Sequence, residues 1–179
     1  MHHRQSFTTK ILQWYGSNQP PLPWRNTTDP YKIWLSEIIL QQTRVAQGTA
    51  YYQSFVSTFP TINDLAASSE EQVLKLWQGL GYYSRARNLH KAAQSVVKNF
   101  DGVFPKTYKD LLSLPGVGPY TAAAVSSICY GEEQAVVDGN VYRVLSRYCG
   151  IEKPINATEG QKYFSALASG KPQIFGLYW

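Results

Sequence analysis

The sequence predicts an all-α protein. Apolar residues recur at the three- and four-residue spacing of one helix face in successive segments, and no stretch of useful length alternates as a half-buried strand would. Helix start and stop signals separate these segments, such as Asp29-Pro30 before one and Asp101-Gly102 after another. Helices are expected at about 6–15, 30–46, 47–58, 62–67, 69–77, 84–100, 107–113, 119–130, 139–149 and 158–168.

The helix expected at 30–46 begins at a clear signal and is apolar on nearly every side. Asp29 suits the N-cap position, and Pro30 suits the first helical position, where no backbone N–H is needed. Six of the eight residues 33–40 are apolar. We therefore expect this helix to be buried nearly all round.

Glu37 lies in the middle of this apolar helix, which is an unusual position for a carboxyl group. Burial disfavours the charged form and should raise the pKa of Glu37, so that its side chain can donate a proton near neutral pH. The alternative is that Glu37 reaches solvent through a polar strip formed with Gln41 and Arg44.

The segment Leu114-Pro115-Gly116-Val117-Gly118 interrupts the apolar pattern between two expected helices. Glycine permits a left-handed backbone at the end of one helix, and Pro119 suits the first turn of the next. Gly116 and Gly118 lack a Cβ atom, so their backbone N–H groups are open to a phosphate oxygen at a helix N-terminus. Taken alone, a plain helix–helix turn with a glycine cap is the alternative.

A second carboxyl group stands at the start of the helix expected at 139–149. Asp138 should accept backbone N–H bonds from Asn140 or Val141, which favours its charged form. In isolation, a plain N-cap is the simpler interpretation. Together with a protonated Glu37, however, Asp138 supplies the second of the two carboxyl groups that acid-assisted cleavage at a sugar C1′ atom requires.

The composition is compatible with a polyanionic partner. The 179 residues carry a net charge of +5, and 14% of them are aromatic, which suits contacts with a nucleic acid without establishing them. The basic residues of the helix expected at 84–100 should lie on a solvated face or, alternatively, against a DNA backbone. They include Arg85, Arg87, Lys91 and Lys98.

Cys129 and Cys149 form neither a disulfide framework nor a metal-binding pattern. We therefore expect a reduced, intracellular protein without a metal site, cytoplasmic if its source is bacterial. No signal peptide follows Met1, and no apolar run is long enough to span a bilayer, so no membrane association is expected.

Five segments carry specific motifs in a fixed order over most of residues 20–150: Pro23-Trp24-Arg25, Trp34 to Thr43, Gly79 to Leu89, Leu114 to Thr121, and Val137 to Val141. Their order and spacing resemble the catalytic region of the MutY-type adenine DNA glycosylases, which belong with endonuclease III to the helix-hairpin-helix superfamily. The Ser-Glu-x-x-Leu-Gln-Gln-Thr motif at 36–43 and the Asp-Gly-Asn-Val motif at 138–141 are the most specific.

The resemblance implies roles for four residues at the reacting bond. Glu37 corresponds to the general acid that protonates adenine N7, and Asp138 to the carboxylate that stabilises the oxocarbenium ion, with Asn140 beside it. Tyr120 occupies the position at which bifunctional relatives carry a Schiff-base lysine. The resemblance therefore implies base removal without strand cleavage.

It also implies how the chain would contact DNA. The pocket around a flipped adenine is expected to comprise Trp24, Arg25, Leu40 and Gln42. The residues that wedge into the duplex near the opposing 8-oxoguanine are expected to be Gln41, Gln42 and Tyr82. The segment against the DNA backbone is expected to be Gly116, Val117 and Gly118.

The resemblance further implies two domains. Residues 21–132 are expected to form a six-helix barrel domain that includes the helix-hairpin-helix at 107–130. Residues 1–20 and 133–179 are expected to form part of a second helical domain, with DNA gripped between the two.

The family's 4Fe-4S cluster is implied for a longer protein, with its four cysteines beyond Trp179. Neither Cys129 nor Cys149 fits that cluster, so no cofactor is expected on this chain. We expect the chain to be a fragment, and residues 172–179 to belong to a helix that is cut short.

The expected function is that of a monofunctional, monomeric DNA glycosylase of base excision repair, acting on adenine mispaired with 8-oxoguanine or guanine in double-stranded DNA. An endonuclease III-like glycosylase and AP lyase for oxidised pyrimidines is the enzyme alternative, opposed by Tyr120 where a lyase needs lysine. A non-catalytic helix-hairpin-helix DNA-binding fragment is the alternative from another class, opposed by the intact Glu37 and Asp138.

Overall fold

The computed structural model describes residues 2–170 and confirms the all-α prediction, since this range contains no β-strand. Most expected helix boundaries agree with the structure to within one or two residues. The elements are α1 (His2–Asn18), the short 3-10 helix η1 (Pro23–Arg25), α2 (Pro30–Leu40), α3 (Val45–Thr58), α4 (Ile62–Ala67), α5 (Glu70–Trp77), α6 (Ser84–Phe100), α7 (Tyr108–Leu111), α8 (Pro119–Tyr130), α9 (Gly139–Cys149) and α10 (Thr158–Ala168).

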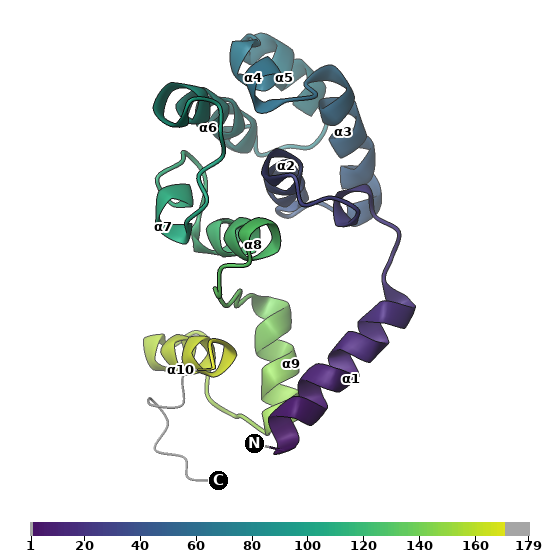
Figure 1. Cartoon of the computed structure of the whole chain (residues 1–179), viewed down its shortest axis with the longest axis vertical. Coiled ribbons are helices and arrows are strands. Elements are labelled where there is room, and N and C mark those ends of the chain that lie inside the picture. The colour runs from purple at the N-terminus through teal and green to yellow at the C-terminus, as the bar shows by residue number, and fades with distance from the viewer. Residues whose placement is uncertain (1, 171–179) are drawn as a thin grey trace.

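Helix α2 lies at the centre of the larger helical group. It contacts α3, α6, α8 and η1, which surround it in Figure 1. Asp29 accepts a hydrogen bond from the Tyr31 amide and Pro30 occupies the first turn, as the sequence predicts. Most of its residues are buried, including Trp34, Leu35 and Ile39, so the predicted burial is confirmed.

The expected continuation of this helix to residue 46 is wrong. Helix α2 ends at Leu40, Gln42 takes a left-handed backbone with a φ of 55°, and α3 starts at Val45. The physical reason lies in another part of the chain, because the guanidinium group of Arg85 donates to the last carbonyl groups of α2. These bonds replace those that further helical turns would have supplied.

The loop between α5 and α6 is held from two sides. The Tyr51 hydroxyl group of α3 donates to the Gln78 carbonyl oxygen at 2.7 Å, and the Trp77 indole N–H donates to the Gly81 carbonyl oxygen at 3.0 Å. Tyr82 follows with a φ of 48° and a side chain that is 67% exposed. The loop thus exposes the Tyr82 ring, while hydrogen bonds from Tyr51 and Trp77 hold its backbone.

The turn between α7 and α8 has the predicted helix-hairpin-helix geometry. Gly116 adopts a φ of 73°, and Pro119 stands in the first turn of α8. An added Cβ atom on Gly116 would lie 2.6 Å from the Cβ atom of Asn88, so the hairpin approaches α6 closely at this point. Gly118 has a φ of −90° and no atom within 4 Å of an added Cβ atom.

Helices α1, α9 and α10 form a separate group in Figure 1. The rings of Phe7 and Tyr148 join α1 to α9 with centroids 4.3 Å apart, and those of Tyr142 and Phe164 join α9 to α10 at 5.1 Å. Packing here is sparse, since α9 contains no buried residue and Trp14 of α1 is exposed.

The division into two domains, with boundaries at residues 20 and 132, stays a prediction. The helix expected at 172–179 lies outside the described residues. Within the part of the chain that the structure describes, no helix has the length and apolar character needed to cross a bilayer.

The two hairpin glycines should respond differently to alanine. Gly116→Ala should lower the free energy of unfolding in urea by at least ~1–2 kcal/mol, because an L-residue is strained at a positive φ and its Cβ atom meets Asn88. Gly118→Ala is the matched control and should leave that free energy unchanged or raise it by up to ~1 kcal/mol. Equal losses for both variants would contradict the hairpin geometry.

Candidate active site

Glu37 is a half-buried carboxyl group on the central helix α2. Burial raises the pKa of Glu37 above its ordinary value of 4.5. Among the described residues neither member of the alternative polar strip pairs with Glu37, since the Gln41 side chain donates to the Thr121 hydroxyl oxygen at 3.4 Å and Arg44 makes no ion pair. Glu37 therefore stays protonated to a higher pH than a solvated glutamate, as a general acid must.

Asp138 is the N-cap of α9, and its carboxylate is fully engaged. One oxygen accepts the backbone N–H groups of Asn140 at 3.0 Å and Val141 at 2.8 Å, and the other accepts the Asn140 side-chain amide at 3.2 Å. The sequence predicts one such backbone bond, and the structure contains two. Asn140 thus orients Asp138 with both its backbone and its side chain.

Tyr120 connects the two carboxyl groups electrostatically. Its side chain, in the first turn of α8, is 44% exposed. Burial raises the pKa of Tyr120 most, and the charges of Glu37 and Asp138 raise it further. Both carboxyl groups, from α2 and from the start of α9, therefore act electrostatically on the phenol of α8.

The hairpin presents two backbone amides that are available to a ligand. No residue of the described part accepts a hydrogen bond from the N–H group of Gly116 or Gly118. Val117 differs, because its N–H group donates to Leu114 and its side chain is only 7% exposed. Of the three residues expected against the DNA backbone, the two glycines are therefore open to an anion, while Val117 anchors the turn in the core.

Two of the three expected wedge residues, Gln42 and Tyr82, share a backbone conformation that the sequence does not reveal. Among the described non-glycine residues only Gln42, Tyr82 and Asp101 have a positive φ, and two of these three are wedge candidates. Each such conformation costs of order 1–3 kcal/mol and persists only where the surroundings impose it. Strain of this kind at two exposed, neighbouring loops is typical of a functional surface.

The expected pocket residues lie on η1 and at the end of α2. Trp24 is buried edge-on against Tyr52, with ring centroids 5.2 Å apart, whereas Arg25 is exposed and its guanidinium group lies over the Tyr15 ring. Leu40 is half-buried at the last turn of α2. The assignment of Trp24, Arg25, Leu40 and Gln42 to one base pocket stays a prediction.

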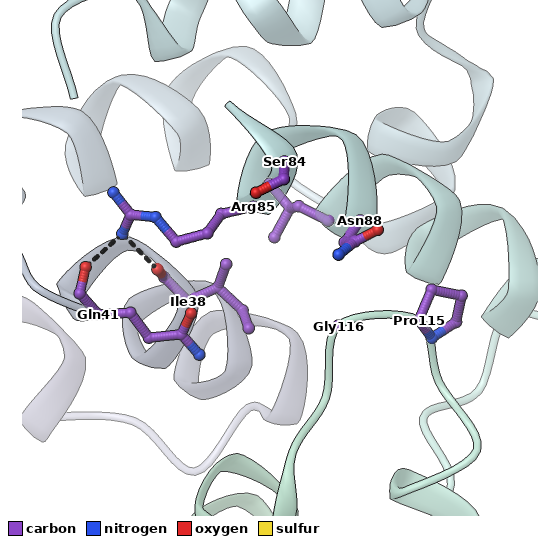
Figure 2. A pocket seen from close by; sticks show the side chains of 8 residues that line it. Ile38, Gln41, Ser84, Arg85, Asn88, Pro115 and Gly116 are labelled. Atoms are coloured by element: carbon purple, nitrogen blue, oxygen red, sulfur yellow. Dashed lines mark hydrogen bonds between the residues drawn. The ribbon is translucent and has the colours of Figure 1, made fainter. Parts of the chain in front are cut away.

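Two small cavities lie beside other candidate site residues. One of about 190 Å³ lies beside Tyr120 and Val137, and one of about 90 Å³ lies between Gln41, Arg85 and Gly116, as Figure 2 shows. Both are smaller than the ~300 Å³ of an ordinary small-molecule pocket. Their size favours a polymer bound across the surface over a small substrate enclosed in a preformed pocket.

Sequence analysis missed the role of Arg85. We expected a solvated or DNA-facing side chain, but its guanidinium group is turned inward to the end of α2. A signal was available in the spacing, since Arg85 stands four, seven and eleven residues before the buried Leu89, Ala92 and Val96. That spacing places it on the apolar face of α6.

The described residues contain no set of side chains that could bind a metal cluster. Within residues 2–170, no group of three or more histidine, cysteine or acidic side chains could hold a metal ion. Cys129 is half-buried on α8 and Cys149 is exposed on α9, whereas a 4Fe-4S cluster is held by four cysteine thiolates. These two residues do not fit the cluster.

Glu37→Gln should stabilise the fold at neutral and higher pH. Burial raises the folded-state pKa of Glu37, so the stability that its protonated form provides is complete below the unfolded pKa and is lost as the pH rises through the folded pKa. Glutamine is neutral throughout, so the Tm of the variant should exceed that of the unmodified chain at about pH 8 and match it at about pH 4. The control Glu133→Gln, at an exposed carboxyl group, should show no such divergence. Parallel melting curves for Glu37→Gln and Glu133→Gln would contradict the burial of Glu37.

Comparison with known proteins agrees with this geometry. Residues 35–168 match the model of the HhH-GPD superfamily base excision DNA repair proteins. The chain is 44% identical to an adenine DNA glycosylase of Buchnera aphidicola over 81% of its length, and 45% identical to that of Homo sapiens over 79%. It covers only 42% and 28% of these two relatives.

A solved thermostable thymine-DNA glycosylase superposes with a TM-score of 0.84 at 32% identity, with 93% of this chain and 77% of that chain covered. The chain therefore belongs to the HhH-GPD superfamily of base excision DNA repair proteins.

Proposed function

We propose that this chain is the catalytic part of a monofunctional DNA glycosylase that acts as a monomer on adenine mispaired with 8-oxoguanine or guanine. The observation that carries the proposal is that Glu37, whose pKa burial raises, and the hydrogen-bonded Asp138 carboxylate both act electrostatically on Tyr120. The curated relatives that bear the name adenine DNA glycosylase support the choice of base.

In the proposed reaction, Glu37 donates its proton to N7 of a flipped adenine. The C1′–N9 bond then breaks, and its electron pair leaves with the base, so that positive charge develops on the sugar. A water molecule adds to C1′ and passes a proton to the Glu37 carboxylate, which restores the acid. The products are free adenine and an intact strand with an abasic site.

Asp138 stabilises the sugar cation through its negative charge. Opposite charges about 4 Å apart at an effective dielectric constant of about 20 attract by about 4 kcal/mol, which corresponds to roughly three powers of ten in rate. This attraction exists only when the cation develops, so it lowers the barrier without tightening substrate binding. The hydrogen bonds from Asn140 and Val141 hold the carboxylate in place for this role.

Contacts with DNA divide between anchoring and base opening. The open N–H groups of Gly116 and Gly118 would bind a phosphate of any sequence. Gln41, Gln42 and Tyr82 would enter the duplex and offset the few kcal/mol that flipping a base costs. The residues proposed around the flipped adenine are Trp24, Arg25, Leu40 and Gln42.

Tyr120 distinguishes this proposal from a lyase. Strand cleavage through a Schiff base needs an amine that attacks C1′, and a phenol cannot form that adduct. No lysine lies in the hairpin from Leu114 to Thr121. A non-catalytic DNA-binding module is opposed by the raised pKa of Glu37, since carboxyl groups whose pKa is raised by burial are typical of proton-transfer sites.

Glu37→Gln should abolish adenine release while DNA binding persists. A single-turnover assay would use a duplex with one adenine opposite 8-oxoguanine, with strand cleavage scored before and after alkali. Loss of the general acid should lower the rate by at least about a hundredfold, because an amide cannot donate the carboxyl proton. The exposed control Glu133→Gln should retain the full rate.

Near-normal excision by Glu37→Gln would overturn the acid assignment. Strand cleavage by the unmodified chain before alkali treatment would support the lyase alternative. Binding to the duplex without any excision would support the non-catalytic module.

A further inference from the structure

Arg85 occupies the first turn of α6 and reaches across to the end of α2, as Figure 2 shows. Its Nη1 group donates to the carbonyl oxygens of Ile38 at 3.1 Å, Ile39 at 3.2 Å and Gln41 at 2.5 Å. These carbonyls close the helix, where the negative end of the helix dipole favours a cation. One guanidinium group therefore ends α2 and begins the turn that carries Gln42.

The same side chain holds the loop before α6. Nη2 donates to the carbonyl oxygens of Leu80 at 3.5 Å and Gly81 at 3.4 Å. The guanidinium carbon lies 5.0 Å from the ring centroid of Trp77 and 5.8 Å from that of Tyr82. Arg85 thus contacts both strained loops, one on each side.

We propose that Arg85 is the positioning residue that holds Gln42 and Tyr82 at a fixed separation for entry into the duplex. The inference rests on the proposed function. It adds the residue that keeps Gln42 and Tyr82 in fixed positions relative to each other. Gln42 and Tyr82 belong to segments about forty residues apart in the chain. Both have left-handed backbones, which neighbouring contacts must impose.

The requirement for arginine follows from geometry. Its planar group carries five N–H donors in a fixed fork, whereas lysine offers one point charge with rotating donors. A single lysine ammonium group cannot span the carbonyls of both loops and also stack on Trp77. Lysine at this position should therefore keep the positive charge but no longer fix the separation of Gln42 and Tyr82.

In the part of the chain that the structure describes, Arg85 carries its charge without the ion pair that would usually accompany a partly buried guanidinium group. Within the described residues, no carboxylate forms an ion pair with Arg85, and its buried Nε atom has no hydrogen-bond partner. Burial accordingly lowers the pKa of Arg85. Carbonyl groups of both loops and the Trp77 and Tyr82 rings compensate this charge instead of a carboxylate.

A direct phosphate contact is the competing role for this cation. The five backbone carbonyl groups already engage both terminal nitrogens, so the fork is turned into the protein. Salt dependence separates the two roles. The affinity falls with rising salt, and each lost phosphate contact makes the slope of log affinity against log salt less steep by about 0.9. Loss of a positioning residue leaves that slope unchanged.

The test compares Arg85→Lys and Arg85→Gln with the control Arg87→Gln. Arg87 lies two residues further along α6, is exposed, and pairs with Glu70 at 3.3 Å. Four measurements are needed: the single-turnover excision rate, the fluorescence of 2-aminopurine placed at the target position, amide hydrogen exchange in peptides covering 38–45 and 78–83, and the salt dependence of duplex affinity.

Both Arg85 variants should lose roughly a hundredfold in excision rate, as misplacement by about 1 Å does. They should also show reduced 2-aminopurine extrusion and faster exchange confined to the two loops, with an unchanged salt slope. Arg87→Gln should match the unmodified chain in excision rate, 2-aminopurine extrusion and hydrogen exchange. Global acceleration of exchange in Arg85→Gln would indicate loss of the fold, and Arg85→Lys then provides the comparison.

Unchanged amide hydrogen exchange in the two loops of the folded Arg85 variants would overturn the inference. A salt slope that becomes less steep by about 0.9 would overturn it as well. Failure of the proposed function looks different. In that case the unmodified chain and Arg87→Gln would both fail to release adenine, and the exchange measurement would still test the positioning role of Arg85.

Discussion

The burial of α2 is the constraint on which the rest of this structure depends. Because helices pack around it, a carboxyl group in its middle is removed from water, and that removal raises the pKa of Glu37. The same packing brings the start of α8, with Tyr120, against the helix that carries the acid. An apolar helix thus does more than fill the core, since it sets the protonation state of the group proposed to start the reaction.

The end of α2 is as important as its middle. If the helix ran on, Gln41 and Gln42 would lie on one more helical turn instead of in an exposed bend. The bend is imposed by a side chain of α6, and the close approach of Gly48 on α3 to Leu40 leaves the returning chain little freedom. The acid and the Gln41–Gln42 half of the wedge therefore derive from one short segment, the first from its burial and the second from its termination.

Local chemistry explains what the sequence could predict. Capping residues such as Asp29 and Asp138 act on amides two or three positions away, and Gly116 supplies a positive φ at its own position, so each can be read without knowledge of the fold. The early end of α2 and the left-handed Gln42 and Tyr82 depend on contacts made across the fold. A pattern of nearby residues cannot show them, although the place of Arg85 on the apolar face of α6 was a usable signal.

The two carboxyl groups owe their properties to different physical sources. Glu37 depends on the well-packed group around α2, whereas Asp138 is oriented by hydrogen bonds within its own helix start, in a helix with no buried residue. The environment of the acid should thus survive wherever the core is intact. The position of Asp138 relative to Glu37 depends instead on how the segment between α8 and α9 is held.

The central claim is that burial keeps Glu37 protonated so that it can act as the acid. Its most direct test is a carbon-13 NMR titration of the glutamate carboxyl groups, assigned by difference with Glu37→Gln, alongside the pH dependence of single-turnover adenine release. The account predicts that Glu37 titrates above 4.5 and that the rate falls as the pH rises through that same pKa. Titration at or below 4.5, or a rate that is constant across the Glu37 transition, would contradict it.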